Sequence, residues 1–380
     1  MNLALATSCY LPYTMSWIHR QLCGYQQGSP VVICQERENE IYFPVGQVLE
    51  LGVEPYYKRA IKAKLGFWFN RRPIALKRSE QKVVQRLLLE QQIDLLHAHF
   101  GTYAVYFSEI CKELDIPLLV TFHGHDISSA FGRWPAYHNA FPGLLQQIRY
   151  AIVISEEMKG RLLQLGCPEE KVKVSYLGVP LDEFPFFDRT DKAEPVIFLH
   201  AGRLTAKKGV PDLVKAFRRA FPEKGAAELW IVGDGEERGL VQQAIDEVGA
   251  GGLIQYLGKK SNEELLEIRN RADVFVLNCR TDAAGTKEGL PIATLEAAAT
   301  GLPAISTYHA GIPESIVDGE TGFLVPEFDN EAFAEAMRKM MVKATRLDMG
   351  KKAREFMEQK FSLEHCNTAL YQVYEQAVNR

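Results

Sequence analysis

Charged side chains follow a glycine turn in the second half of this 380-residue sequence. Gly202 ends a short apolar run, and Arg203 and Lys208 come soon after it. Arginine presents a planar fork of donors and lysine a compact charge, so the pair suits an anion such as a diphosphate. Gly233 marks a second strand-to-glycine turn, where the backbone can approach a ligand closely. The alternative is that both cations are ordinary surface charges beside a loop.

Two glutamates with seven residues between them form a second candidate. Glu288 precedes an alanine-rich stretch that contains Glu296, and Pro291 suits the first turn of the helix predicted there. The free amides near Gly289 and Leu290 then form a positive helix terminus that binds an anion without a metal. Both carboxylates can point into one pocket and accept hydrogen bonds from sugar or ribose hydroxyls. Alternatively, Glu288 interacts only with the helix dipole and Glu296 is solvated.

Histidines follow two predicted strands in the first half of the chain. His123 is succeeded by a glycine, His125 and Asp126, which together make a small polar site with backbone freedom. His97 and His99 occupy a similar position after an earlier apolar run. For these two histidines, a structural role at the end of a strand is the alternative.

An α/β architecture is predicted to position these side chains. Short apolar runs typical of buried parallel strands alternate with helical patterns along most of the chain. The predicted strands are 3–6, 31–34, 95–98, 118–122, 151–154, 172–175, 196–201, 228–232, 254–257, 274–277 and 304–306. Helices are predicted between them, for instance at 81–91 and 104–114. Residues 180–195 are rich in proline and charge and predict a linker between two such series.

Composition excludes several classes of protein. The length favours two domains. Hydrophobic residues make up 47% and charged residues 24%, as in a globular chain, and the formal charge of −4 argues against a protein coated with nucleic-acid-binding charge. Seven scattered cysteines without metal-binding spacing predict reduced thiols and a cytoplasmic protein. No apolar run reaches the length that spans a bilayer.

As a set, these motifs resemble the retaining glycosyltransferases of family four, which have the GT-B fold. The second half carries Gly202-Arg203, Lys208-Gly209, Gly233-Asp234-Gly235, Glu288 with Glu296, and the stretches 310–314 and 318–324. The stretches 97–100 and 122–128 look like the exopolysaccharide branch, of the colanic-acid and amylovoran type. The resemblance implies two Rossmann-like domains with parallel sheets facing across a cleft. The acceptor-binding domain would span 1–185, completed by a C-terminal helix at about 362–380, and the sugar-nucleotide domain 190–361.

The resemblance also implies roles for individual residues. Donor binding would fall to Gly202, Arg203, Lys208, Gly233, Glu288, Gly289, Leu290 and Glu296. Arg203 and Lys208 would hold the diphosphate, Glu296 the ribose, and Glu288 the donor-sugar hydroxyls and phosphate. The catalytic residues would be His123, Glu288, Arg203 and Lys208, with His123 beside the sugar. Acceptor contacts are expected from Tyr10, Trp17, His125 and Asp126, although the glycine-rich loop of many relatives is replaced at 7–17.

The expected reaction is transfer of a sugar, with retention, from a nucleoside-diphosphate sugar to a hydroxyl of a saccharide or lipid-linked acceptor. By analogy with the family, the nucleotide of the donor is expected to be UDP, and the pathway is expected to be polysaccharide or glycolipid biosynthesis. The sequence has no Asp-x-Asp motif, so neither a metal nor another cofactor is expected. The alternatives are a sugar-nucleotide epimerase of the same layout, a transferase for a small metabolite, and a non-catalytic binding subunit.

One segment departs from the acidic average. Between Lys58 and Lys82 the chain carries nine basic residues and one acid, interleaved with aromatic residues. Such a surface adheres to an anionic membrane leaflet, which predicts a peripheral position at the inner membrane face. The alternative is a set of solvated helix faces. No nucleic-acid partner is expected.

Overall fold

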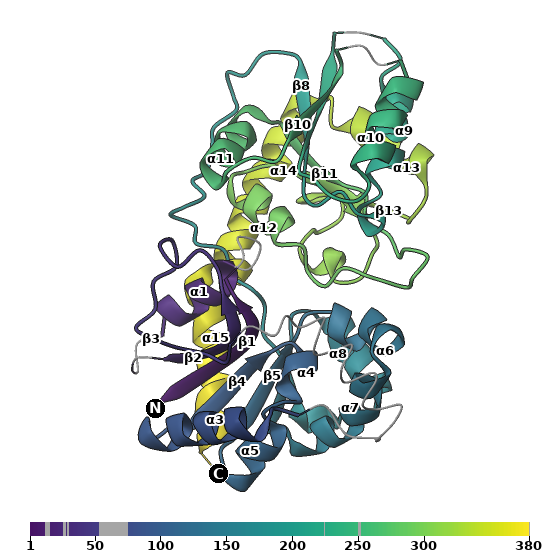
Figure 1. Cartoon of the computed structure of the whole chain (residues 1–380). Coiled ribbons are helices and arrows are strands. Elements are labelled where there is room, and N and C mark those ends of the chain that lie inside the picture. The colour runs from purple at the N-terminus through teal and green to yellow at the C-terminus, as the bar shows by residue number, and fades with distance from the viewer. Residues whose placement is uncertain are drawn as a thin grey trace. The chain divides into compact units, whose positions relative to one another are not determined.

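The chain folds into two compact α/β units (Figure 1). The computed structural model describes residues 1–11, 16–25, 28, 30–52, 75–223, 225–249 and 252–379. The N-terminal unit comprises Met1–Gly178 with Leu363–Arg380, and the C-terminal unit comprises Val179–Ser362. The division therefore falls after residue 178, where the sequence suggested a domain end at 185, and the chain returns to the first unit after residue 362.

The N-terminal unit is built on a seven-stranded sheet whose neighbouring strands all run parallel, in the order β3-β2-β1-β4-β5-β6-β7. The strands are β1 (Leu3–Tyr10), β2 (Val31–Arg37), β3 (Gln47–Glu50), β4 (Leu95–His99), β5 (Leu118–Phe122), β6 (Tyr150–Val153) and β7 (Val172–Val174). The sequence did not predict β3, because its residues are exposed or half-buried at the sheet edge and form no apolar run.

Helices flank this sheet. They are α1 (Ser16–Cys23), α3 (Arg78–Glu90), α4 (Gly101–Ala104), α5 (Ser108–Glu113), α6 (Ser129–Arg133), α7 (Pro135–Gln147), α8 (Glu156–Gln164) and α15 (Leu363–Val378), with short 3-10 turns η2 (His125–Ile127) and η3 (Glu169–Lys171). The helix predicted at 104–114 is interrupted. Between α4 and α5, Phe107 is wholly buried and packs edge-on against Tyr103.

The C-terminal helix joins the N-terminal unit through polar contacts in the interior. The hydroxyl of Tyr374 lies 2.7 Å from Nδ1 of His97 on β4, and the hydroxyl of Tyr371 donates to the carbonyl of Gln21 at 2.6 Å. Figure 1 shows α15, in yellow, among the purple and blue elements of this unit. His97 therefore has the structural role that the sequence left as its alternative, because its other ring nitrogen is bonded to Thr121.

The C-terminal unit has a six-stranded parallel sheet in the order β10-β9-β8-β11-β12-β13. Its strands are β8 (Val196–Ala201), β9 (Ala227–Val232), β10 (Ile254–Gly258), β11 (Val274–Leu277), β12 (Ala304–Thr307) and β13 (Gly322–Val325). Alternating residues of β8 enter two separate hydrophobic clusters, Phe198 in one and Leu199 in the other. The sheet is thus buried on both faces, as its apolar strands predict.

Helices cover both faces of the second sheet. They are α9 (Val210–Ala220), α10 (Arg238–Glu247), α11 (Asn262–Arg271), α12 (Ile292–Ala299), α13 (Asn330–Lys339) and α14 (Lys343–Phe356), with the short helical turns η4 (Ala206–Lys208), η5 (Ile312–Glu314) and η6 (Met357–Phe361). In each sheet the strand order reverses beside the first strand, at β1/β4 and at β8/β11. Ligands of open parallel sheets bind at such switch points, beyond the carboxyl ends of the strands.

The predicted linker at 180–195 contains no helix or strand, as expected, but it belongs to the C-terminal unit and is anchored there through Arg189. Arg189 is 7% exposed and donates hydrogen bonds to the carbonyl groups of Ala272, Thr300 and Arg269, among others. These partners lie far along the chain, and composition alone could not reveal that they hold the segment in place.

Three further expectations concern the surface and the compartment. Residues 58–74 of the basic segment lie outside the described residues. All seven cysteines are free. Within the described ranges, no helix combines the length and the apolar character needed to cross a bilayer.

Candidate active site

The predicted glycine turns bring the ends of β8 and β9 together. The backbone N–H of Gly202 donates to the carbonyl of Val232 at 3.0 Å. A Cβ added at Gly233 would lie 1.9 Å from the carbonyl oxygen of Gly202, and the φ of Gly233 is +141°. Only glycine fits this backbone approach and this conformation. The two glycines therefore allow the backbones after β8 and β9 to pack closely together, next to the neighbouring cations.

The two predicted cations differ in exposure. Arg203 follows β8 and is exposed, and its side chain makes no hydrogen bond or ion pair with any other described residue. Lys208 ends the turn η4 and is only 8% exposed. Burial would lower the pKa of Lys208, but electrostatic interactions with Cys279 and Glu288, of which Glu288 is the group ionised at neutral pH, raise it above its ordinary value. Lys208 is therefore a buried, fully charged ammonium.

Glu288 is the anion that compensates this charge. Its Oε1 lies 3.2 Å from Nζ of Lys208 and 3.0 Å from Nζ of Lys207. Burial would raise the pKa of Glu288, but the two lysines lower it to about 2. With Arg203 nearby, the cluster holds three cations and one anion. Lys207 was not among the predicted site residues, although its position beside Lys208 was the available signal.

The helix after Glu288 begins later than predicted. Pro291 is the N-cap of α12, with an extended ψ of 111°, and the helix starts at Ile292. The amides of Gly289 and Leu290 therefore lie just before the helix and not in its first turn. The carbonyl of Gly289 accepts a hydrogen bond from the N–H of Gly311 at 3.1 Å, so this loop is held by the loop after β12.

The second glutamate has a separate partner. Glu296 on α12 forms an ion pair with Arg269 of α11, whose side chain is 3% exposed. Glu288 is paired instead with the lysines of η4. The two carboxylates thus contact cations from different elements, which the spacing of the glutamates alone did not indicate. Arg269 was missed because its pairing depends on how α11 packs beside α12.

His200 on β8, which was not among the predicted site residues, adds a buried hydrogen-bond acceptor. Its Nδ1 lies 3.2 Å from the carbonyl of Val276, while its Nε2 has no hydrogen-bond partner among the described residues. That nitrogen would lie 3.7 Å from a Cβ placed on Gly202. Burial lowers the pKa of His200 to about 3, so the ring is neutral and presents a lone pair beside the glycine turn.

In the N-terminal unit, His123 lies in a cage of rings at the carboxyl end of β5. Its Nε2 is 3.2 Å from Nδ1 of His99. Its ring centroid lies 4.6 Å from that of Trp17 and 4.5 Å from that of Phe100. Burial, with a smaller contribution from His97, lowers the pKa of His123 to about 3. His123 is therefore a neutral imidazole at neutral pH.

Asp126 anchors the loop that carries His123. Its Oδ1 accepts the N–H of His123 at 2.9 Å and its Oδ2 accepts the N–H of Gly101 at 2.8 Å. Burial raises the pKa of Asp126 to about 6, even though these backbone hydrogen bonds act in the opposite direction. Because the side chain is wholly buried and both oxygens are bonded, it is not free to make the acceptor contact expected from the sequence.

The other three expected acceptor residues are placed differently from one another. Tyr10 is wholly buried, because β1 extends four residues beyond the strand predicted at 3–6. Its hydroxyl has no partner among the described residues. Trp17 packs beside His123, and the ring of His125 contacts that of Trp134 edge-on at 5.1 Å. Trp17 is thus the member of the expected set that lies against the candidate catalytic histidine.

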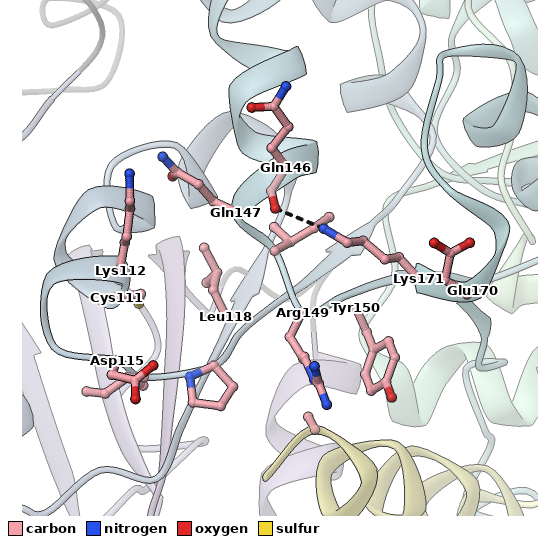
Figure 2. A pocket seen from close by; sticks show the side chains of 14 residues that line it. Cys111, Lys112, Asp115, Leu118, Gln146, Gln147, Arg149, Tyr150, Glu170 and Lys171 are labelled. Carbon is pink, nitrogen blue, oxygen red and sulfur yellow. Dashed lines mark hydrogen bonds between the residues drawn. The ribbon is translucent and has the colours of Figure 1, made fainter. Parts of the chain in front are cut away.

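A groove of about 1030 Å³ lies elsewhere in the N-terminal unit, at the amino ends of β5, β6 and β7 (Figure 2). Figure 2 shows Lys112, Arg149 and Lys171 around it. Lys171 donates to the carbonyls of Leu145 and Gln146 at the end of α7. None of the predicted site residues lines this groove. The groove also lies at the amino ends of the strands, whereas ligands of such sheets bind beyond the carboxyl ends, at the switch point.

One group of side chains in the N-terminal unit has a spacing that could hold a metal ion. In the part of the chain that the structure describes, the His, Cys and carboxylate side chains close enough to share one ion are Cys9, Glu36 and Glu38. They belong to the N-terminal unit, whereas the lysine and glutamate cluster belongs to the C-terminal unit.

Comparison with known proteins identifies the family. Residues 26–183 match glycosyltransferase family 4, and residues 183–356 match glycosyl transferases group 1. The chain belongs to this family of glycosyltransferases. The amylovoran biosynthesis glycosyltransferase AmsK of Erwinia amylovora is 32% identical over 65% of this chain and 61% of its own length. The putative colanic acid biosynthesis glycosyltransferase WcaL of Escherichia coli K12 is 32% identical over 73% of this chain and 69% of its own length.

Solved structures establish the fold. Anabaena Alr3699/HepE, crystallised with UDP and glucose, superposes with a TM-score of 0.79 over 99% of this chain and 100% of its own, at 17% identity. The sucrose-phosphate synthase of Thermosynechococcus elongatus superposes with a TM-score of 0.75 over 99% of this chain and 98% of its own, at 19% identity. At these identities the likeness concerns the fold alone. The predicted GT-B fold and the resemblance to the exopolysaccharide branch are confirmed.

Proposed function

We propose that this chain transfers a sugar, with retention of configuration, from a UDP-sugar to a hydroxyl of a saccharide or lipid-linked acceptor in polysaccharide biosynthesis. The names of AmsK and WcaL support the setting, and UDP with glucose in the HepE crystal supports the donor class. The domain roles follow the same proposal, with the donor in the C-terminal unit and the acceptor in the N-terminal unit.

The observation that carries the proposal is the buried carboxylate of Glu288 between Lys207 and Lys208, with exposed Arg203 nearby. Three cations against one anion leave an excess of two positive charges at the carboxyl end of β8. A diphosphate has the complementary charge, and Arg203 has donors available to bind it. Glu288 in turn can accept hydrogen bonds from donor-sugar hydroxyls, because it remains ionised at any physiological pH.

In the proposed reaction, the bond between the anomeric carbon and the diphosphate oxygen breaks, and the diphosphate keeps the electron pair. The acceptor oxygen bonds to the anomeric carbon on the same face, and its proton passes to the leaving diphosphate. Lys208 and Arg203 stabilise the charge that develops on the leaving group, without reorganising as the reaction proceeds. The proposal needs no divalent metal, because these cations supply the neutralising charge.

His123 is proposed to contact the transferred sugar from the acceptor side, with Trp17 as a neighbouring wall. A neutral imidazole can both donate and accept hydrogen bonds, which suits sugar hydroxyls. His123→Ala is expected to reduce turnover at least about 100-fold. His138→Ala is the matched control, because His138 is an exposed histidine of α7, and it should retain wild-type turnover. Equal rates for the two variants would remove His123 from the site.

The donor test compares nucleotides and lysines. Wild-type protein is expected to bind UDP in calorimetry and to release it from a UDP-sugar when an oligosaccharide acceptor is added. Lys208→Ala should lower the rate at least about 100-fold. Lys215→Ala should not, because Lys215 is a half-exposed lysine of α9 paired with Asp212 at 3.7 Å. Binding of GDP in preference to UDP would reject the donor assignment.

Product analysis separates transfer from the alternatives. Mass spectrometry should detect a lengthened acceptor, and NMR of its new anomeric proton should show the configuration of the donor. An isomerised sugar nucleotide formed without acceptor would indicate the epimerase, and an inverted product would reject retention. Turnover should persist in EDTA. If EDTA abolishes turnover and Mg²⁺ restores it, the metal-independent mechanism is wrong.

A further inference from the structure

Three groups of the C-terminal unit lie in a hydrogen-bonded row behind the candidate donor site. Oε1 of Glu327, after β13, is 2.7 Å from Nδ1 of His309, after β12. Nε2 of His309 accepts the backbone N–H of Glu288 at 3.0 Å. The other oxygen of Glu327 accepts the N–H of Thr281 at 2.8 Å. The side chain of His309 is wholly buried, whereas that of Glu327 is 24% exposed, so the ring of His309 is the part of the row that is shielded from water.

This row determines which ring nitrogen of His309 carries the proton. A nitrogen that accepts a backbone N–H must present a lone pair, so Nε2 is unprotonated. The proton is then on Nδ1 and is donated to Glu327. Burial lowers the pKa of His309, although the hydrogen bond to Glu327 opposes this effect. The ring is thus neutral and has one tautomer, because the opposite tautomer would direct an N–H at the N–H of Glu288.

The same row constrains the loop that carries the Glu288 carboxylate. The N–H of Gly311 donates to the carbonyl of Gly289, which is a second connection between the two loops. The side chain of Glu288 meanwhile contacts Lys207 and Lys208. The backbone of Glu288 is therefore held on one side by His309 while its carboxylate faces the lysines on the other.

We propose that His309 and Glu327 are positioning residues of the donor site: Glu327 selects the tautomer of His309, and His309 holds the backbone of Glu288 so that its carboxylate meets the lysines and the donor. The inference rests on the proposed function for the identity of the donor. Neither residue contacts the donor itself. Their effect is transmitted through the main chain of Glu288.

Two substitutions of the histidine separate positioning from simple packing. In His309→Gln, the amide oxygen can reach the place of Nε2 and accept the N–H of Glu288. In His309→Asn, the shorter amide can still bond Glu327 but leaves the N–H of Glu288 without its acceptor. Both variants lose the ring, so both should lose similar thermal stability. Tyr308→Phe is the matched control, because Tyr308 is 53% exposed and its hydroxyl bonds only Asp318 among the described residues.

The expected result is a split between the variants. His309→Asn should weaken UDP binding at least 10-fold in calorimetry and lower kcat/KM with a UDP-sugar at least as much. His309→Gln should recover both to within about 3-fold of wild type, and Tyr308→Phe should match wild type. Equal losses in the Asn and Gln variants would assign His309 a packing role only, and unchanged binding in both would also overturn the proposal.

A measurement on the resting wild-type protein does not depend on the donor. The ¹⁵N NMR spectrum of the His309 ring should show a protonated Nδ1 and an unprotonated Nε2. In Glu327→Ala, which removes the acceptor of the Nδ1–H, the opposite tautomer should become more populated. A ring protonated at Nε2 in the wild type would overturn the proposal. Failure of the wild type to bind any nucleoside diphosphate would reject the proposed function, while this spectrum would still decide whether the row holds Glu288.

Discussion

Replacing Glu288 by glutamine should destabilise the protein as well as impair transfer. The substitution keeps the size of the side chain and removes one negative charge. In the wild type, this buried carboxylate lies 3.0 Å and 3.2 Å from two ammonium groups. The variant would leave Lys207 and Lys208 beside each other in a buried site with no compensating anion.

The magnitude follows from the same geometry. The pKa of Glu288 falls from an ordinary value of 4.5 to about 2 in the folded state. This difference corresponds to a stabilisation of the charged form by about 3 kcal/mol on folding. Removing one partner of a buried ion pair costs roughly 3–5 kcal/mol in other proteins. Both routes give a loss of about 3 kcal/mol in the free energy of unfolding at pH 7.

The assay is urea denaturation of the wild type and the variant at pH 7. Glu331→Gln is the matched control, because Glu331 also pairs with two cations, Arg219 and Arg338, but its side chain is 57% exposed. Exposed ion pairs contribute little to stability, so this control should leave the free energy of unfolding nearly unchanged. UDP should recover part of the loss in Glu288→Gln, since it adds negative charge near the lysines.

The pH dependence has a definite sign. Because the pKa of Glu288 is depressed on folding, its contribution is complete above about pH 4.5 and is lost as the pH falls toward 2. The wild type and Glu288→Gln should therefore converge in stability over that range. A loss at pH 7 no larger than that of the Glu331→Gln control would refute the assignment of a buried, charge-compensating carboxylate.

Further predictions concern the two cores. Tyr374→Phe removes the partner of a buried nitrogen of His97 and should lower the free energy of unfolding by about 1–3 kcal/mol in urea. Because burial lowers the pKa of His97 to about 3, the unfolded chain binds a proton that the folded chain does not, and stability should fall by about 2 kcal/mol on this account between pH 7 and 5. In calorimetric melts, the stability of His97→Asn should depend less on pH than that of the wild type. An unchanged pH dependence in this variant would contradict the assignment to His97. Gly233→Ala should cost more than about 2 kcal/mol because its Cβ would clash with Gly202, whereas Gly239→Ala, in open space on α10, should stabilise by about 0.5–1 kcal/mol. Similar melting temperatures for the two alanine variants would contradict the close approach.

Most strands could be predicted because burial leaves a direct trace in the sequence. A parallel strand covered by helices on both faces reads as an unbroken apolar run, and the predicted strands at 196–201 and 274–277 coincide with β8 and β11. The edge strands β3 and β13 were missed. β3 has no fully buried residue, and β13 is a four-residue strand that begins with a glycine directly after a turn.

The candidate site was predictable in part for a similar reason. Arg203, Lys208 and Glu288 are found from their places after strands and before a helix, which is local information. His309 was not, because it acts on the backbone of Glu288 from 21 residues away. Its relevance depends on the neighbouring ends of β11 and β12, so no spacing in the sequence marks it.

The sequence by itself determined three features of this protein. These are the succession of apolar runs that form the parallel strands, the types of charged residue that follow those strands, and the family to which the chain belongs. The tertiary structure alone decided the state of each charge. Asp126, within the turn η2, and Glu288, ahead of α12, are both buried carboxylates, yet the pKa of Asp126 is raised to about 6 and that of Glu288 is lowered to about 2. The difference arises because backbone N–H groups only partly offset burial around Asp126, whereas two ammonium groups contributed by a distant turn outweigh it around Glu288.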